Sequence, residues 1–234
     1  MSILLIAGLW LDASAWDDVV GHLRELGHDP VAIALPGQGA PPARATLGDQ
    51  RAAVVAAVDA ATAPVMVVGH SAACALAWMA ADARPEKVAR VAMIGGFPSA
   101  DGDVYADSFA AVSGAVAFPG WEPFDGPDAA DLDETMRATF AARAVPVPEG
   151  VAQGIVRLGD ERRFDVPVTL VCPEFSPAQA QAWVEQGDVS ELARARHVDY
   201  ADIDSGHWPM LTRPAELAAL LDRAARSAGE RGDR

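Results

Sequence analysis

The residue best suited to chemistry in this sequence is Ser71, in the stretch Gly-His-Ser-Ala-Ala at 69–73. An apolar run at 65–68 precedes it, and an Ala-rich run at about 72–82, expected to be helical, follows it. A serine held on a sharp strand-to-helix turn projects its hydroxyl clear of the sheet, and the new helix offers N–H groups to an oxyanion. We therefore predict that Ser71 is a nucleophile rather than only a helix cap.

Two other loops carry groups that a serine nucleophile needs. A hydroxyl is a poor nucleophile at neutral pH without a base, and His207 lies in a loop after a predicted strand. The loop after the first predicted strand contains Leu9, whose backbone N–H can converge with that of Ala72 on an oxyanion. The expected roles are Ser71 as nucleophile, His207 as base and then acid, and Leu9 and Ala72 as oxyanion-hole donors.

The carboxylate that orients His207 has three possible sources. A neutral histidine base needs an acceptor for its Nδ1–H, because otherwise the wrong tautomer faces the serine. Glu174 is the first choice, since it follows the strand predicted at 166–171. Asp103 and Asp101 come next, because they follow the preceding strand, which is adjacent in a parallel sheet. If none of these three carboxylates serves, His207 would work in a dyad, oriented by Ser176 or a backbone carbonyl.

Aromatic residues are expected to line the substrate pocket. Trp10 follows Leu9 directly and Trp208 follows His207, while Trp121 and Phe124 lie in the irregular segment 97–165. These aromatics, with the scarcity of Lys in that segment, predict an apolar, uncharged acyl site. Taken singly, each of the four is equally compatible with an ordinary core position.

Strands and helices are predicted to alternate through most of the chain. Strands are expected at about 3–6, 31–35, 65–68, 88–94, 166–171 and 197–203, and helices at about 12–26, 47–61, 72–82, from 177 onward and 214–226. Such repeated units predict the α/β class, with a mostly parallel sheet flanked by helices on both faces. The tail from about 227 is expected to be disordered.

The segment 97–165 interrupts this alternation. It is rich in Pro and Gly, with helices expected near 131–142 and 149–158. A structureless loop of that length is unusual in a compact domain. We expect an inserted helical cap at 97–165 and a core domain formed by 1–96 and 166–234.

Composition narrows the classes of function. The chain has 234 residues and a net charge of -15, which disfavours nucleic acid and anionic membranes as partners. No signal-like start or membrane-length apolar run is found, so a cytoplasmic location is expected. The 2 cysteines, Cys74 and Cys172, are read as buried thiols. The 5 histidines are scattered without metal-ligand spacing, so no metal or other cofactor is expected, and a small molecule is the expected partner. The oligomeric state stays open.

The chain resembles the α/β-hydrolase superfamily over nearly its whole length. The matching motifs are Ala-Gly at 7–8, where the family's oxyanion loop has His-Gly, Leu-Pro-Gly-Gln-Gly at 35–39, the serine turn at 69–73, and Gly-His at 206–207. The stretches 8–16 and 206–217 look most like the branch of plant methyl-ester esterases and hydroxynitrile lyases and its bacterial relatives. The family usually places Asp where this chain has Ser176.

We therefore expect a serine hydrolase that cleaves a small, largely apolar carboxylic ester through an acyl-enzyme. One alternative is a lyase or carbon–carbon hydrolase on the same scaffold, which would need an additional polar group beside the triad. The other is a ligand-binding protein with a relic triad, suggested by the missing Asp and the missing oxyanion-loop His. Turnover of a short-chain nitrophenyl ester discriminates enzyme from receptor, since this fold hosts many reactions.

Overall fold

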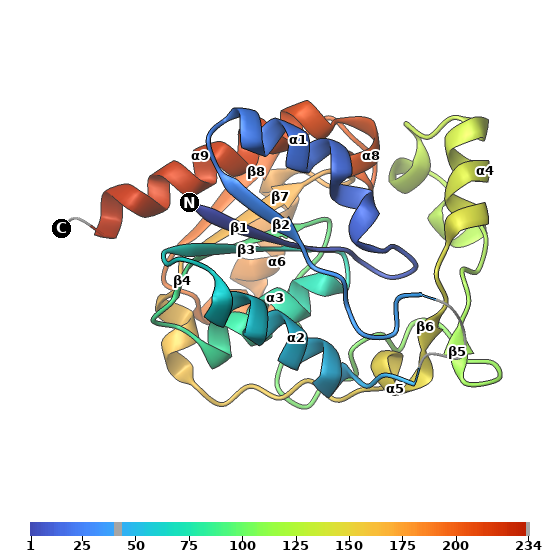
Figure 1. Ribbon diagram of the computed structural model, residues 1–234, viewed down its shortest axis with the longest axis horizontal. Helices are drawn as coiled ribbons and strands as arrows, with labels where there is room; N and C mark the ends of the chain where they lie inside the picture. Colours follow the sequence, from blue (N-terminus) through green and yellow to red (C-terminus); the bar gives the residue numbers. More distant parts are fainter. Residues whose placement is uncertain (40–43, 233–234) are drawn as a thin grey trace.

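A six-stranded parallel sheet forms the centre of the protein (Figure 1). The computed structural model describes residues 1–39 and 44–232, with side chains to Ser227. The strand order is β2-β1-β3-β4-β7-β8, and the strands are β1 (Ser2–Ile6), β2 (Asp29–Ala32), β3 (Val65–His70), β4 (Val88–Ile94), β7 (Val168–Cys172) and β8 (Val198–Asp202). The central strands β1, β3 and β7 are buried along their whole length, as expected for parallel strands covered on both faces.

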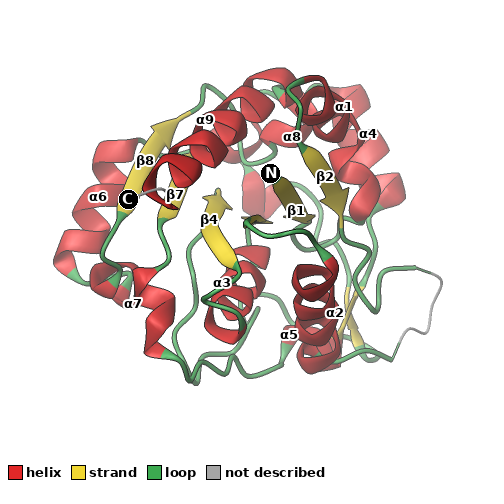
Figure 2. Ribbon diagram, turned by 60° about the vertical axis from the view of Figure 1, so that its left-hand side comes forward, coloured by secondary structure: helices red, strands yellow, loops and turns green. Residues whose placement is uncertain are grey.

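Helices cover both faces of this sheet. On one face α1 (Asp17–Glu25), preceded by the 3-10 turn η1 (Ala13–Trp16), packs against α9 (Pro214–Gly232). On the other face α2 (Leu47–Ala60) packs against α3 (Ala73–Ala83). Figure 2 shows the two pairs on opposite sides of the strands, with α6 (Pro177–Gln186) and α7 (Ser190–Arg194) beside β7 and β8. The short helix α8 (Pro209–Thr212) precedes α9. The predicted mostly parallel sheet with helices on both faces is confirmed.

The segment between β4 and β7 contains less helix than predicted. Its longest helix is α4 (Glu134–Arg143), and the helix expected near 149–158 is the single turn α5 (Glu149–Ala152). The other elements are the antiparallel strand pair β5 (Ala115–Val116) and β6 (Val147–Pro148) and the 3-10 turns η2 (Glu122–Phe124), η3 (Pro127–Ala129) and η4 (Glu161–Asp165). Beyond α5, Gly154 packs so closely on Leu47 that a Cβ there would overlap it. The chain then runs extended, with a bridge between Val104 and Ile155.

Two other predicted boundaries were wrong. The strand expected at 31–35 is β2, which begins at Asp29 and ends at Ala32. The apolar residues Ile33 and Leu35 are buried beyond this end. Ile33 N–H still donates to the Leu5 carbonyl of β1 at 2.9 Å, whereas Leu35 N–H donates to the side chain of Gln38. The last helix does not end near 226: α9 continues to Gly232 where a disordered tail was expected.

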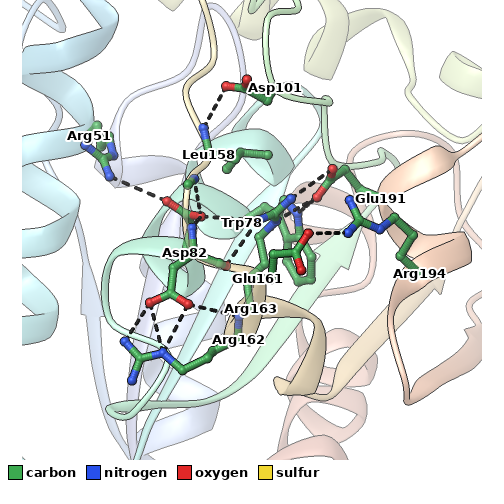
Figure 3. Close-up of polar contacts among 12 residues, drawn as sticks. Arg51, Trp78, Asp82, Asp101, Leu158, Glu161, Arg162, Arg163, Glu191 and Arg194 are labelled. Carbon is green, nitrogen blue, oxygen red and sulfur yellow. Dashed lines mark hydrogen bonds and ion pairs between the residues drawn. The ribbon is translucent and has the colours of Figure 1, made fainter.

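A buried ionic cluster joins α3 to the segment that leads into β7. This Arg163 cluster consists of Trp78, Asp82, Arg163 and Glu191 (Figure 3). Arg163 donates to both oxygens of Glu191, from Nε at 2.8 Å and from Nη2 at 3.2 Å, and Trp78 Nε1 donates to Glu191 at 2.7 Å. Asp82 accepts from the backbone N–H groups of residues 159 and 160, both at 2.8 Å. The cluster therefore anchors the return of the chain to the sheet.

Candidate active site

Ser71 occupies a sharp turn between β3 and α3. Its φ is 55°, a left-handed conformation that is uncommon for a residue other than glycine. The turn is tight because Gly69 lies against the backbone of α3, where a Cβ would come within 2.8 Å of the Cα of Cys74. Ser71 N–H donates to the carbonyl of Ile94 at 2.8 Å, which ties the turn to β4. This backbone presents the partly exposed Ser71 at the carboxyl end of the sheet.

His207 and Glu174 meet at the same edge of the sheet. Glu174 follows β7 and His207 follows β8, and parallel strands deliver their carboxyl ends to one side. His207 Nδ1 lies 2.8 Å from Glu174 Oε1, and the two side chains are only 12% and 14% exposed. This distance is that of a charge-assisted hydrogen bond in which His207 donates. The arrangement fixes the tautomer that leaves His207 Nε2 free to accept a proton.

Two consecutive glycines, Gly95 and Gly96, adjoin these side chains and Ser71. Gly95 has a φ of +56°, and a Cβ there would lie 3.1 Å from His207 Nδ1 and 3.2 Å from Glu174 Oε2. A Cβ on Gly96 would lie 3.0 Å from the Cα of Ser71. The dipeptide after β4 therefore adjoins the His207–Glu174 pair through Gly95 and the backbone of Ser71 through Gly96.

The other acid candidates have different partners. Asp101 accepts a hydrogen bond from the backbone N–H of Leu158 at 3.0 Å, and Asp103 accepts one from that of Ala100 at 2.7 Å. Ser176 caps α6, with its hydroxyl accepting from Gln179 N–H. Glu174 is thus the carboxylate that the structure brings to His207.

The loop after β1 approaches Ser71 closely. A Cβ on Gly8 would lie 3.0 Å from the Cβ of Ser71 and 2.8 Å from Nδ1 of His70. Leu9 is the next residue along this loop, and Ala72 is the residue before α3. The two predicted oxyanion donors are therefore on segments that adjoin Ser71.

His70 is a site residue that the sequence analysis did not identify. Its ring is 1% exposed, and its Nε2 lies 2.8 Å from the backbone carbonyl oxygen of His207. Burial, followed by the charge on His207, lowers the pKa of His70 well below 6.5. His70 is therefore a neutral side chain that donates its Nε2–H to the loop carrying His207.

The segment between β4 and β7 also contacts the histidine loop. His207 N–H donates to the carbonyl of Asp128 at 2.7 Å, and Ser205 Oγ donates to Asp131 at 3.1 Å. Burial, together with the charge on Glu174, raises the pKa of the Asp128 carboxyl. No motif marks Asp128 in the sequence, because its contact with His207 is made by its backbone.

The four aromatic residues predicted to line the pocket belong to one aromatic cluster. Trp208 lies with its ring centroid 5.4 Å from each of Trp121 and Phe124, and Trp10 lies 5.8 Å from Phe124. Three further rings complete the cluster: Phe109, Phe118 and Phe140. The indole N–H of Trp10 donates to the Val116 carbonyl at 3.3 Å. The cluster packs the segment between β4 and β7 onto the loops after β1 and β8.

Two hollows adjoin Trp10. The smaller one is bordered by Gly8, Leu9 and Tyr105. The larger one lies between η1 and α4 and is bordered by Phe140 and Arg143 among others. Trp10 therefore borders both hollows, and the loop that carries it also carries Leu9. The buried Tyr105, whose pKa burial raises, is a second neighbour of the oxyanion loop that the sequence analysis did not identify.

The two cysteines are buried and are poor nucleophiles at neutral pH. Cys74 and Cys172 are both free thiols, as predicted. Burial raises the pKa of each to about 12, so the thiolate form is scarce at neutral pH. Within residues 1–39 and 44–232, the His, Cys, Asp and Glu side chains that the structure describes, up to Ser227, form no group of three suited to a metal ion. No helix in that part of the chain is both long and apolar enough to cross a membrane.

Solved structures share this architecture along their whole length. An extracellular α/β-hydrolase from a Paenibacillus species, described as sharing structural and functional homology with tobacco salicylic acid binding protein 2, is 20% identical, with a TM-score of 0.77 over 96% of this chain and 98% of its own. A methylesterase from Arabidopsis is 14% identical, with a TM-score of 0.73 over 97% and 99%. A pyrethroid hydrolase from Sphingobium faniae is 20% identical, with a TM-score of 0.71 over 98% and 99%.

Sequence comparison gives the family. No curated protein matches the chain. The sequence model of the alpha/beta hydrolase family, by contrast, matches residues 3–220, which include the serine turn, Glu174 and the histidine loop. The chain therefore belongs to the alpha/beta hydrolase family.

Proposed function

We propose that this protein is a serine hydrolase that cleaves a small, largely apolar carboxylic ester through an acyl-enzyme. The observation that carries the proposal is the 2.8 Å contact between His207 Nδ1 and Glu174, beside a serine held at a φ of 55°. A carboxylate, a histidine with its Nε2 free and a serine on a strained turn are the parts that such catalysis requires.

The reaction follows from these roles. Ser71 Oγ attacks the ester carbonyl carbon while His207 Nε2 takes its proton, and Glu174 stabilises the imidazolium that forms. The N–H groups of Leu9 and Ala72 stabilise the oxyanion, each contributing about 3–4 kcal/mol. His207 then returns the proton to the departing alkoxide, which leaves an acyl group on Ser71. Water, activated by His207, attacks the acyl carbon and releases the acid.

The substrate class rests on the surroundings of the site. The aromatic cluster around Trp10 and Trp208 and the net charge of -15 favour an apolar, uncharged ester over a polyanion. The Arabidopsis protein is a methylesterase by name and the Sphingobium faniae protein is a pyrethroid hydrolase by name, and both share the architecture of this chain. We assign the segment 97–165 to a cap that covers the site, since Asp128 and Asp131 bind the histidine loop.

A lyase on the same scaffold is the second candidate. A methylketone synthase from tomato, solved with beta-ketoheptanoate, has the same architecture at 16% identity and a TM-score of 0.72. The half-buried Asp128, whose pKa is raised by partial burial and by the charge on Glu174, is a candidate for the additional polar group that a lyase would need. A small molecule remains the expected partner. A cytoplasmic location remains a prediction; one of the similar proteins is described as extracellular.

Turnover of a short-chain nitrophenyl ester tests the proposal. The wild type should release nitrophenol, and Ser71→Ala should reduce the rate to that of the buffer. Beta-keto acids and cyanohydrins are run in parallel. Turnover of these compounds without ester hydrolysis would move the assignment to the lyase, and hydrolysis that persists in Ser71→Ala would remove Ser71 from its role.

A further inference from the structure

Three separate contacts hold His207 in position. Its side chain is held by Glu174 at Nδ1, and its backbone N–H donates to the Asp128 carbonyl at 2.7 Å. Its backbone carbonyl lies 2.8 Å from Nε2 of His70. The first contact belongs to the triad, and the second is made by backbone. The third depends on a side chain for which the proposed reaction has no role.

The chemistry of His70 in this position is determined by its partner. A carbonyl oxygen only accepts, so His70 Nε2 must carry the proton. Its Nδ1 is buried and has no hydrogen-bond partner among the described residues, and it faces Gly8, where a Cβ would lie 2.8 Å away. A proton on Nδ1 would place a positive charge on a buried ring, and the centroid of this ring lies 4.9 Å from that of the His207 ring. Both effects favour the neutral ring.

The position of His70 makes it a spacer between three parts of the site. It directly precedes Ser71 on β3, it touches the oxyanion loop at Gly8, and it bonds to the loop of His207. The nucleophile, the oxyanion loop and the base therefore share one rigid, buried ring as a common neighbour. A displacement of that ring moves the base relative to the nucleophile.

We propose that His70 is a positioning residue for catalysis: its Nε2–H fixes the backbone of His207 and thereby sets the distance between that imidazole and Ser71. This inference rests on the proposed function of Ser71 and His207. His70 stays neutral throughout the cycle, because the imidazolium that forms on His207 further disfavours a proton on its neighbour.

Two variants of similar size separate donation from packing. His70→Gln carries an amide N–H that reaches about as far as Nε2 and can donate to the same carbonyl, whereas His70→Leu fills the space without a donor. We expect His70→Leu to lower kcat by about 10- to 100-fold with little change in KM, since a small misplacement of a base costs about this much. His70→Gln should recover most of the lost kcat.

The kinetic result is decisive in both directions for variants that fold. Wild-type kcat in His70→Leu would overturn the proposal, and so would a His70→Gln variant no faster than His70→Leu. Thermal unfolding of each variant reports whether it is folded when assayed.

A measurement on the wild type keeps the test independent of folding and of hydrolase activity. The ¹⁵N chemical shifts of a histidine-labelled sample report which ring nitrogen of His70 carries a proton. The proposal requires the neutral Nε2–H form between pH 6.5 and 8.5, with a slowly exchanging proton. A protonated ring, or the Nδ1–H form, in that range would overturn it. If ester hydrolysis is not found while His70 shows this form, the proposed function fails and the contact with His207 remains.

Discussion

Two buried polar clusters flank α3, and they differ in how fully their atoms are paired. At the C-terminal half of the helix, both oxygens of Glu191 accept from the guanidinium of Arg163, and Asp82 binds two backbone N–H groups. Glu191, Asp82 and Arg163 are 5%, 6% and 4% exposed. At the N-terminal end of the helix, around His207, the carboxylate Glu174 is paired through one oxygen only.

The unpaired atoms at the second cluster have a common location. Among the described residues, the buried carboxylate oxygens without a hydrogen-bond partner are Oε2 of Glu174 and Oδ1 of Asp131, and both adjoin the histidine loop. Buried polar atoms are usually paired, because leaving one unpaired costs about 1–3 kcal/mol. A saturated cluster stabilises the fold, whereas one with unused acceptors can respond to a proton or a substrate. We infer that the Arg163 cluster stabilises the fold and that the His207 cluster carries the chemistry.

The largest expected effect is on the rate, from Glu174→Gln. Loss of the negative charge allows the wrong tautomer of His207 and removes stabilisation of the imidazolium, so kcat should fall by about 10³- to 10⁴-fold. The free energy of unfolding should change little. Steady-state kinetics and a urea titration of the same sample measure both quantities.

Asp101→Asn and Asp103→Asn are the matched controls for that experiment. Their carboxylates bind backbone N–H groups elsewhere, so kcat should stay near that of the wild type. A collapse of kcat in either variant, with normal activity in Glu174→Gln, would move the acid to the end of β4.

A substitution in the Arg163 cluster is expected to have the opposite effect: a loss of stability without a loss of kcat. Arg163→Met removes the cation that pairs with the buried Glu191 and leaves Asp82 with the more distant Arg51, 3.8 Å away, and such a change typically costs about 3–5 kcal/mol of stability. The kcat of the molecules that remain folded should be nearly unchanged. Chemical denaturation followed by circular dichroism measures the cost. A large loss of kcat with normal stability would show that the two clusters are not divided as we infer.

A smaller effect on stability is expected from glycines with positive φ. Gly95→Ala and Gly187→Ala should each cost about 1–2 kcal/mol of stability through backbone strain, since φ is +56° and +86°. A Cβ meets His207 and Glu174 at the first position and nothing within 4 Å at the second. Only Gly95→Ala should therefore lower kcat as well. Equal kcat values in the two variants would remove Gly95 from the site.

The smallest effect is a pH dependence of stability due to His70. Its native pKa lies below the ordinary value of 6.5, so below that pH the unfolded chain binds a proton that the native state does not. The free energy of unfolding should therefore fall as the pH drops below about 6.5, by up to about 1.4 kcal/mol per pH unit from this group. His70→Gln should flatten that slope. Equal slopes between pH 5 and 7 in urea titrations would show that His70 is not held neutral.

Much of the site follows from the sequence because parallel strands deliver their ends to one edge. Ser71, Glu174 and His207 each follow a recognisable apolar run, so their meeting needed only the order of the strands. Glu174 is the first choice for the carboxylate because it follows a predicted strand, and its side chain, longer than that of Asp, reaches His207 from two residues before Ser176.

Other features lay beyond local patterns. The contact of His70 with His207 joins positions 137 residues apart, and Asp128 takes part through its backbone. The helix expected at 149–158 stops after one turn, and just beyond it Gly154 packs against Leu47. This contact joins residues far apart in the sequence, so no local pattern predicts it. The boundaries of β2 differ because an edge strand is defined by pairing with β1 and not by its apolar residues.

Covalent labelling with a fluorophosphonate tests the central claim, that Ser71 is a nucleophile activated by the His207–Glu174 pair. Mass spectrometry of the intact and digested protein gives the rate and the site of labelling. The account predicts one label, on Ser71, with a rate that falls by orders of magnitude in Glu174→Gln and stays unchanged in Arg163→Met. Labelling that survives Ser71→Ala, or that proceeds equally fast in Glu174→Gln, would contradict it.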